Sequence, residues 1–205
     1  MNTENISTSQ DQNQTDSPIA PAAQTNPNLY NGTNYIVRLG LPDKNNSLPF
    51  IFSISQAVID FGKLYPTNPI TRTLNLNLSK GSAAGYSIIA SQDHPLKDSF
   101  GDLIPDTTCD NGSCLETTSN LWTNTLTYGY GYRCDGADCS TGFEEINFYK
   151  QFADESKEES AQTIMSSQNK QANIKGQVTY KVNIAVTQAQ GNYGNVINYI
   201  AVPNF

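Results

Sequence analysis

The residues with the most specific chemistry in this chain are its four cysteines, which occur as two similar pairs. Cys109 and Cys114 enclose Asp-Asn-Gly-Ser, and Cys134 and Cys139 enclose Asp-Gly-Ala-Asp. Four cysteines allow three pairings, but two short loops with similar turn-forming residues favour the local disulfides Cys109–Cys114 and Cys134–Cys139. A zinc site is the alternative, although structural zinc sites usually place two residues between paired cysteines. Disulfides would indicate an oxidising compartment.

Aromatic side chains form the second candidate site. Tyr128, Tyr130 and Tyr132 alternate with glycines, so a strand over this segment places all three rings on one face. Trp122 has the same parity. An exposed row would be a contact surface for a glycan or a protein, whereas a buried row would belong to the core, and we favour burial or partial burial. If the protein binds a ligand, we expect the contacts here, where the two cysteine loops meet this segment.

Carboxylates cluster in two short runs. The first contains Asp135, Asp138, Glu144 and Glu145, and the second extends over residues 154–159. Calcium requires six to eight oxygen ligands, and Asp135 and Asp138 are the candidates for such a site. Neither run has the spacing of an EF-hand or of a repeat-type calcium loop. We therefore expect most of these acids to be solvated, with no metal ion or other cofactor required.

His94 is the single histidine, so a Ser-His-Asp or Cys-His arrangement would need it as the general base. It lies in the turn Ser91–Pro95, which has no nucleophile motif. Paired cysteines offer no activated thiolate. The acidic runs lie beside Gly and Ser, without the apolar setting that raises the pKa of one carboxyl group above that of its neighbour. We therefore expect no enzymatic activity.

Strands must position these residues, because apolar and polar residues alternate along much of the chain. Val178–Val186 and Val196–Val202 alternate on either side of the turn residues Gly191–Gly194, which predicts a closing antiparallel hairpin. Arg72–Leu78 alternates as well, and Tyr86–Ser91 is predicted to be its partner strand. About eight to ten short strands with turns roughly every ten residues are typical of a sandwich. The predicted fold is therefore all-β, an immunoglobulin-like antiparallel β-sandwich.

Shared parity along each strand predicts the core. A slip of one residue would move a whole set of side chains to the other face, so the set is either buried together or exposed together. The side chains predicted to face inward are Leu74, Leu76, Leu78, Ile88, Tyr180, Val182, Ile184 and Val186.

Two regions differ in composition. Residues 1–33 are rich in Gln, Asn, Thr, Ser and Pro, and such a segment cannot bury enough apolar area to offset its ordering entropy. We expect residues 1–33 to be a flexible, disordered polar tether and residues 34–205 to form the β-sandwich domain. An alternative is that Tyr35–Leu39 is a strand donated to a neighbouring subunit.

Composition favours a location outside the cell. Charged residues make up 15% of the 205 residues and the net charge is −7, so the chain lacks the basic surface that nucleic acids or anionic membranes attract. No stretch approaches the about 20 apolar residues of a membrane span. Met1–Asn5 does not resemble a signal peptide, so we expect that a signal or anchor has been removed or that the chain is a fragment.

Four segments resemble, in their order, elements of the WxL surface domain of Gram-positive bacteria, namely Val58–Gly62, Arg72–Leu74, Gly85–Gln92 and Val178–Val182. In that family aromatic-x-aliphatic motifs lie on two strands, and the matching triplets here begin at Tyr86 and Tyr180, where Tyr replaces Trp. Gly191–Ile197 is similar to the last hairpin of spore-coat-U-like secreted pilin domains. The resemblance implies an immunoglobulin-like sandwich displayed outside the cell; peptidoglycan binding is a property of the WxL family, which the replacement of Trp puts in question.

These features predict a noncatalytic bacterial protein, secreted or displayed on the cell surface, that acts in cell-surface structure or adhesion. The expected partners are a cell-wall polymer, a glycan or another surface protein, including further copies of itself. Two alternatives stay open. One is a pilin-like filament subunit that assembles by donating a strand from residues 1–39. The other is a carbohydrate-binding module that uses Tyr128, Tyr130, Tyr132 and the nearby acids.

Overall fold

The structure is a computed structural model that describes residues 38–39, 48–168 and 173–205. The predicted tether, residues 1–33, lies outside the described residues. The elements are β1 (Arg38–Leu39), β2 (Phe50–Ile54), β3 (Ile70–Ser79), β4 (Gly85–Gln92), β5 (Leu96–Lys97), β6 (Leu103–Ile104), β7 (Asn120–Leu121), β8 (Gly129–Asp135), β9 (Phe148–Tyr149), the 3-10 helix η1 (Glu155–Lys157), β10 (Gln162–Ser167), β11 (Asn173–Asn183) and β12 (Ile197–Asn204).

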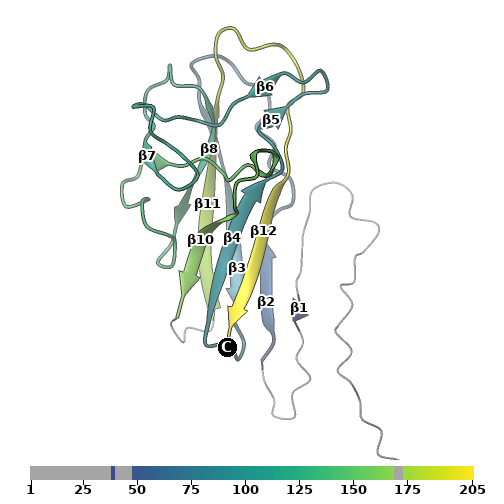
Figure 1. Ribbon diagram of the computed structural model, residues 1–205, viewed down its shortest axis with the longest axis vertical. Coiled ribbons are helices and arrows are strands. Elements are labelled where there is room, and N and C mark those ends of the chain that lie inside the picture. Colours follow the sequence, from purple (N-terminus) through teal and green to yellow (C-terminus); the bar gives the residue numbers. More distant parts are fainter. Residues whose placement is uncertain (1–37, 40–47, 169–172) are drawn as a thin grey trace, which may run out of the picture.

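Two antiparallel sheets form the body of the protein. The larger sheet has the strand order β1-β2-β3-β11-β8, and the smaller has the order β10-β4-β12. Figure 1 shows that the two sheets lie face to face, with β4 and β12 in front. Two further strand pairs, β5-β6 and β7-β9, lie in the connecting regions. The all-β class is therefore confirmed, and the immunoglobulin-like arrangement stays a prediction.

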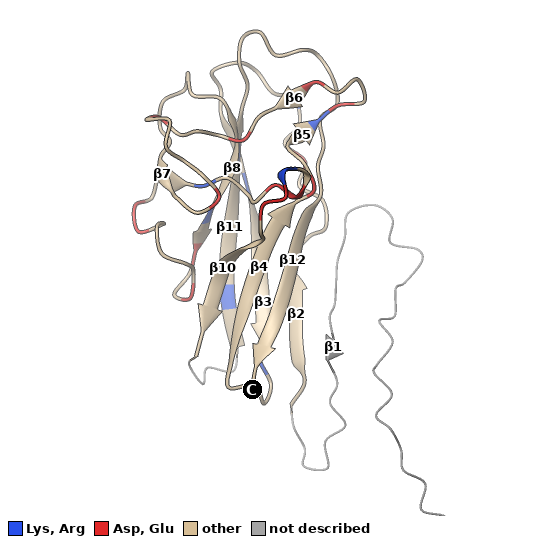
Figure 2. Cartoon of the chain, viewed as in Figure 1, with Lys and Arg blue, Asp and Glu red and all other residues tan. Residues whose placement is uncertain are grey.

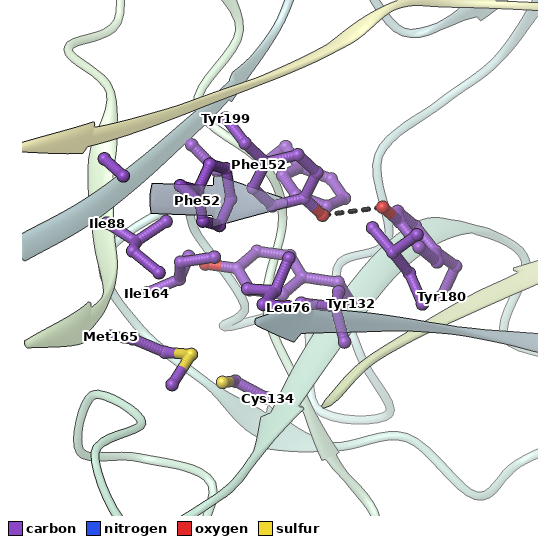
Figure 3. Close-up of a cluster of buried hydrophobic side chains, with 14 of the residues drawn as sticks. Phe52, Leu76, Ile88, Tyr132, Cys134, Phe152, Ile164, Met165, Tyr180 and Tyr199 are labelled. Atoms are coloured by element: carbon purple, nitrogen blue, oxygen red, sulfur yellow. Dashed lines mark hydrogen bonds between the residues drawn. The ribbon is translucent and has the colours of Figure 1, made fainter. Parts of the chain in front are cut away.

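The core lies between the two sheets and draws side chains from both (Figure 3). In β3 the leucines at positions 74, 76 and 78 are buried, whereas Asn75 between them is exposed. Ile88 of β4 belongs to the same cluster, as do Tyr180 and Val182 of β11. The predicted inward-facing set is confirmed at these positions, because alternation along a strand reports which face is covered.

The buried face of β11 ends earlier than its sequence predicts. The strand stops at Asn183, which pairs with Gly129, the first residue of β8. Ile184 is only partly buried, and Val186 is 78% exposed. The prediction for Val186 was wrong because the alternating pattern continues beyond the last residue that has a strand partner.

The predicted closing hairpin was also wrong. β11 pairs with β3 and β8 in the larger sheet, whereas β12 pairs with β4 in the smaller one. Residues 184–196 therefore cross from one layer to the other, and this segment is longer than the two to five residues of most hairpin loops. Across the layers, the hydroxyl groups of Tyr180 and Tyr199 share a hydrogen bond of 2.6 Å (Figure 3).

The predicted pairing of β3 with β4 was wrong as well. The two strands lie in different sheets. Alternation identifies the buried face of each strand but does not identify its neighbour. The predicted hairpin and the predicted β3–β4 pair were both wrong for this reason, and neither error changes the fold class.

The loop of the second disulfide closes one lateral side of the two sheets. Cys134 is the next-to-last residue of β8, and the loop from there to Cys139 runs along the edge strand β10. The backbone N–H of Ser140 donates to the carbonyl of Ile164 at 2.8 Å, and that of Ser166 donates to the carbonyl of Asp138 at 2.9 Å. On the opposite side, no backbone hydrogen bond joins β2 to β12 within the described residues.

Both predicted disulfides, Cys109–Cys114 and Cys134–Cys139, are present. Replacing Cys134 and Cys139 together with Ser should lower the free energy of unfolding by about 2 kcal/mol, the value that loop-closure entropy gives for so short a loop. Urea denaturation measures this loss. Mass spectrometry of a nonreduced digest checks the pairing first, and a peptide that links one loop to the other would contradict it.

The part of the chain that the structure describes contains no helix long and apolar enough to cross a membrane.

Candidate functional site

The structure separates the four aromatic residues that the sequence singles out as ligand contacts. Tyr130 and Tyr132 are buried in the main core, and Trp122 is buried in a second, smaller cluster. Tyr128 is 48% exposed. The ligand-contact prediction was therefore wrong for the three buried residues, and the favoured interpretation, burial, holds for them.

Aromatic packing explains why Tyr130 and Tyr132 face inward. The ring of Tyr132 stacks on Phe152 with 4.1 Å between centroids, and Tyr130 stacks on Phe152 and Tyr180. The glycine between the two tyrosines faces the other way, and a Cβ atom at Gly131 would lie 2.6 Å from the carbonyl oxygen of Lys150. Glycine is therefore required at this position by the close approach of another backbone segment.

Trp122 lies after β7, not on the strand that carries the tyrosines, and its ring covers a lysine. The ammonium group of Lys181 donates to the carbonyl oxygen of Trp122 at 2.6 Å and lies 4.6 Å from the centroid of its ring and 5.0 Å from that of Tyr149. The Cys109–Cys114 disulfide belongs to the same buried cluster. Burial lowers the pKa of Lys181. This arrangement holds the loop against β11 and leaves no ring surface for a ligand.

The two calcium candidates have protein partners. Asp135 accepts hydrogen bonds from the guanidinium group of Arg133, with the Nε atom at 3.0 Å from both carboxylate oxygens. Asp138 accepts a hydrogen bond of 2.8 Å from the hydroxyl group of Tyr86. Among the described residues, no three His, Cys, Asp or Glu side chains come together as a metal site would need. Asp138 therefore links the disulfide loop to β4, and Asp135 orients Arg133, whose guanidinium group also donates to the carbonyls of Glu145 and Phe143.

A groove of about 1240 Å³ lies on the lateral side that the disulfide loop does not close. One wall is the irregular segment 54–66 that follows β2. The other is the crossing segment 184–197 that leads into β12, drawn in yellow in Figure 1. Leu74, Tyr130, Tyr180 and Tyr199 of the two sheets lie between the walls. Sequence reasoning missed this groove because the walls lie largely outside the alternating segments by which strands are recognised.

Hydrogen bonds hold the crossing segment in place. Gln188 donates from its amide nitrogen to the carbonyl of Leu103 at 3.1 Å and to the hydroxyl oxygen of Tyr193 at 2.8 Å. The same hydroxyl group donates to the carbonyl of Ala189 at 2.8 Å. These bonds fix the position of the Tyr193 side chain in the groove wall.

The opposite wall is held by Arg72 of β3. Its Nε atom donates to the carbonyl of Asp60 at 2.9 Å, and its Nη2 atom donates to the carbonyl of Phe61 at 3.3 Å. The carboxylate of Asp60 in turn accepts a hydrogen bond of 2.7 Å from the backbone N–H of Gly62. Both walls are therefore tied to the sheets by side chains, although neither is a regular strand.

A chain of polar groups leads away from the groove. The amide nitrogen of Asn195 donates to Gln92 at 3.2 Å, and Gln92 donates to Asp106 at 2.6 Å. The ammonium group of Lys157 lies 3.2 Å from Asp106 and 3.0 Å from Asp154, so one cation bridges two carboxylates. Figure 2 shows that acidic and basic residues gather around the short helix, while β4, β10 and β12 carry none.

The two bridged carboxyl groups titrate differently. Burial raises the pKa of Asp106, against hydrogen bonds from Gln92 and Lys157 that lower it. Burial also acts to raise the pKa of Asp154, but hydrogen bonds from Ser156 and Lys157 outweigh that effect, and the pKa lies below its ordinary value. Asp154 therefore stabilises the fold in its ionised form, whereas ionisation of Asp106 is disfavoured by its surroundings.

Replacing Asp154 with Asn should lower the free energy of unfolding at pH 7 by about 1.5–3 kcal/mol, the usual contribution of hydrogen bonds to a charged group. A carboxyl group with a lowered pKa stabilises the fold above its unfolded pKa, and that contribution is lost as the pH falls through the folded pKa. The variant should therefore lose less stability than the wild type on acidification below about pH 4. Urea denaturation at several pH values measures both effects.

The matched control is Asp106→Asn. Its carbonyl oxygen can still accept from Gln92, and the exchange removes a charge that burial disfavours, so the loss at pH 7 should be smaller than for Asp154→Asn. A larger loss at Asp106, or an unchanged acid response in Asp154→Asn, would contradict the assignment of the two carboxyl groups.

Comparisons with known proteins add no relative to this description. No family model, no curated protein and no solved structure matches the chain. The resemblance to WxL and spore-coat-U-like domains therefore depends on the quoted segments alone and stays a prediction. What the structure defines is an all-β, doubly disulfide-bonded protein with a lateral groove.

Proposed function

We propose that the protein is a noncatalytic bacterial module, secreted or displayed on the cell surface, that acts in adhesion or surface structure by holding a partner in the lateral groove. The groove of about 1240 Å³ between two fixed walls is the observation that carries this proposal. Sites that are largely preformed bind without a large ordering cost. Two disulfides suit an oxidising, extracellular location.

A binding role fits the groove better than catalysis does. Among the described residues, the lining contains one carboxylate, that of Asp60, whereas hydrolysis by paired carboxylates needs two. His94, the candidate base, lies in a turn where its Nδ1 atom is 2.7 Å from the carbonyl oxygen of Pro95 and its Nε2 atom is 3.4 Å from Asp93. The buried acids Asp106 and Asp154 are engaged with Lys157. These contacts support a binding function.

Filling the groove tests the proposal. Ala57→Trp and Ala189→Trp each place a large ring in the groove lining, and either exchange should abolish retention of the protein by isolated cell walls and cell-surface extracts of the source organism. Thr163→Trp, on an exposed position of β10, is the matched control and should bind as the wild type does. Equal retention of all three variants would show that any binding does not use the groove.

A filament subunit that assembles by strand donation is the second candidate. The observation in its favour is that β12 has a strand partner on one side, β4, and lies on the open side of the two sheets. Arg38 and Leu39, from the predicted donor segment, pair with Ile51 and Phe50 of the same chain. Donation would transfer this segment to the open side of another copy, where main-chain hydrogen bonds extend the sheet.

Assembly in solution separates the two candidates. If the protein assembles by donation, the full chain should form concentration-dependent oligomers in analytical ultracentrifugation, and deletion of residues 1–39 should abolish them. A synthetic peptide of residues 30–42 should compete with assembly, whereas a peptide of the same composition in scrambled order should not. A full chain that sediments as a monomer at every concentration would contradict strand donation.

A further inference from the structure

Unused hydrogen-bonding groups lie along the crossing wall of the groove. The side chains of Gln190 and Asn192 line the groove and are exposed, and neither makes a hydrogen bond within the described residues. On the facing wall, the amide group of Gln56 makes one long contact of 3.4 Å, with the carbonyl of Thr73. Primary amides both donate and accept, so these groups can bind a ligand rich in hydroxyl groups.

Two aromatic rings accompany the amides. Tyr65, on the rim of the wall that Arg72 holds, is 53% exposed and begins a tight turn closed by a hydrogen bond from the N–H of Asn68 to its carbonyl. Tyr193, on the crossing wall, is fixed through its hydroxyl group. Tyrosine rings supply large contact areas at low entropic cost when they are fixed before binding.

The lining is nearly uncharged, although the protein is acidic. Asp60 and Lys63 are the charged residues among the described residues that line the groove, and their charges balance each other. The ammonium group of Lys63 lies 5.2 Å from the centroid of the Tyr65 ring. A polyanion would be repelled by the net charge of −7. A polycation would be attracted mainly to the acidic residues that lie outside the groove. The charge distribution therefore favours a neutral ligand.

The dimensions favour a chain over a single small molecule. The groove volume of about 1240 Å³ exceeds the roughly 300–1,000 Å³ that is usual for small-molecule pockets. A polypeptide strand would need a continuous backbone edge to pair with, but the walls, residues 54–66 and 184–197, are largely irregular. A ligand that binds through side-chain amides and ring faces does not need such an edge.

From these observations we infer that the groove binds a neutral polysaccharide, whose sugar faces stack on Tyr65 and Tyr193 and whose hydroxyl groups bond to Gln190 and Asn192. The inference rests on the proposed function and adds to it the chemical class of the ligand. It also moves the carbohydrate site away from the tyrosines at positions 130 and 132, which are buried, to a different face of the protein.

Affinity electrophoresis of the full chain tests this inference. Gels that contain a neutral glucan, mannan, galactan or chitin derivative should retard the protein in at least one case, whereas gels with alginate or hyaluronan should not. Tyr65→Ala and the double variant Gln190→Ala/Asn192→Ala should each weaken the retarding interaction by about tenfold, in the range expected for loss of one well-packed aromatic or polar contact. Tyr128→Ala, which removes an exposed tyrosine outside the groove, should leave retardation unchanged.

Each other outcome has a defined meaning. Stronger retardation by the anionic polysaccharides, or equal retardation of all variants, would overturn the inference. If no neutral polysaccharide retards the protein while cell walls still retain it and Ala57→Trp abolishes that retention, the proposed function stands and the ligand class is wrong. If the peptide of residues 30–42 prevents retention by cell walls and no polysaccharide does, the ligand of the groove is a polypeptide.

Discussion

Truncation of Tyr132 to Ala is expected to lower the free energy of unfolding by about 3–5 kcal/mol, the usual cost of removing a large buried ring. The side chain is 1% exposed and packs between Phe152 and Phe143, at centroid distances of 4.1 and 5.6 Å. The cavity left behind would lie at the centre of the core, where neighbouring rings from β8 and β11 cannot close it without losing their own contacts. Thermal and urea denaturation both measure the loss.

Tyr128→Ala is the matched control, since it removes the same ring from the exposed position two residues before Tyr130. A surface substitution of this kind usually changes stability by about 0.5 kcal/mol or less. If Tyr132→Ala kept its stability and lost binding to glycans, Tyr132 would not be buried. The row of tyrosines would then again be the candidate contact surface.

The sequence contained enough information to predict faces and local links. The spacing of the cysteines predicted both disulfides, because each loop is short enough for its own turn to bring the two thiols together. Alternation predicted that Leu74, Leu76 and Ile88 face inward, because every second side chain of a strand lies on the same face. These features depend on neighbours within a few positions of the chain.

Features that depend on distant segments could not be predicted in this way. Whether Tyr130 and Tyr132 are buried depends on Phe152, which lies in a segment without periodicity. The bridge of Asp106, Lys157 and Asp154 unites acids from two separate loops. The groove requires the segment after β2 and the segment before β12 to face each other, and no local pattern marks either one. The predictions of strand partners were wrong for the same reason, since the pairing of strands depends on the whole fold.

The clearest test of the strand faces is a pair of substitutions on β3. Leu76 is 1% exposed and lies opposite Gly176 of β11 and Ile54 of β2, so Leu76→Ala should cost about 2–5 kcal/mol through lost burial and a residual cavity. Asn75, its exposed neighbour, accepts a long side-chain contact of 3.3 Å from Gln177, and Asn75→Ala should cost at most about 1 kcal/mol.

The two variants should differ in the midpoint of urea unfolding and not in its slope, because a change in midpoint alone reports stability and not a change in the area exposed on unfolding. Equal losses at positions 75 and 76 would mean that β3 is covered on both faces. Such a result would place a further segment over the outer face of the larger sheet. A large loss of stability in Leu76→Ala, with little loss in Asn75→Ala, is the result expected for a two-layer core. Both walls of the groove are attached to the sheets that form this core.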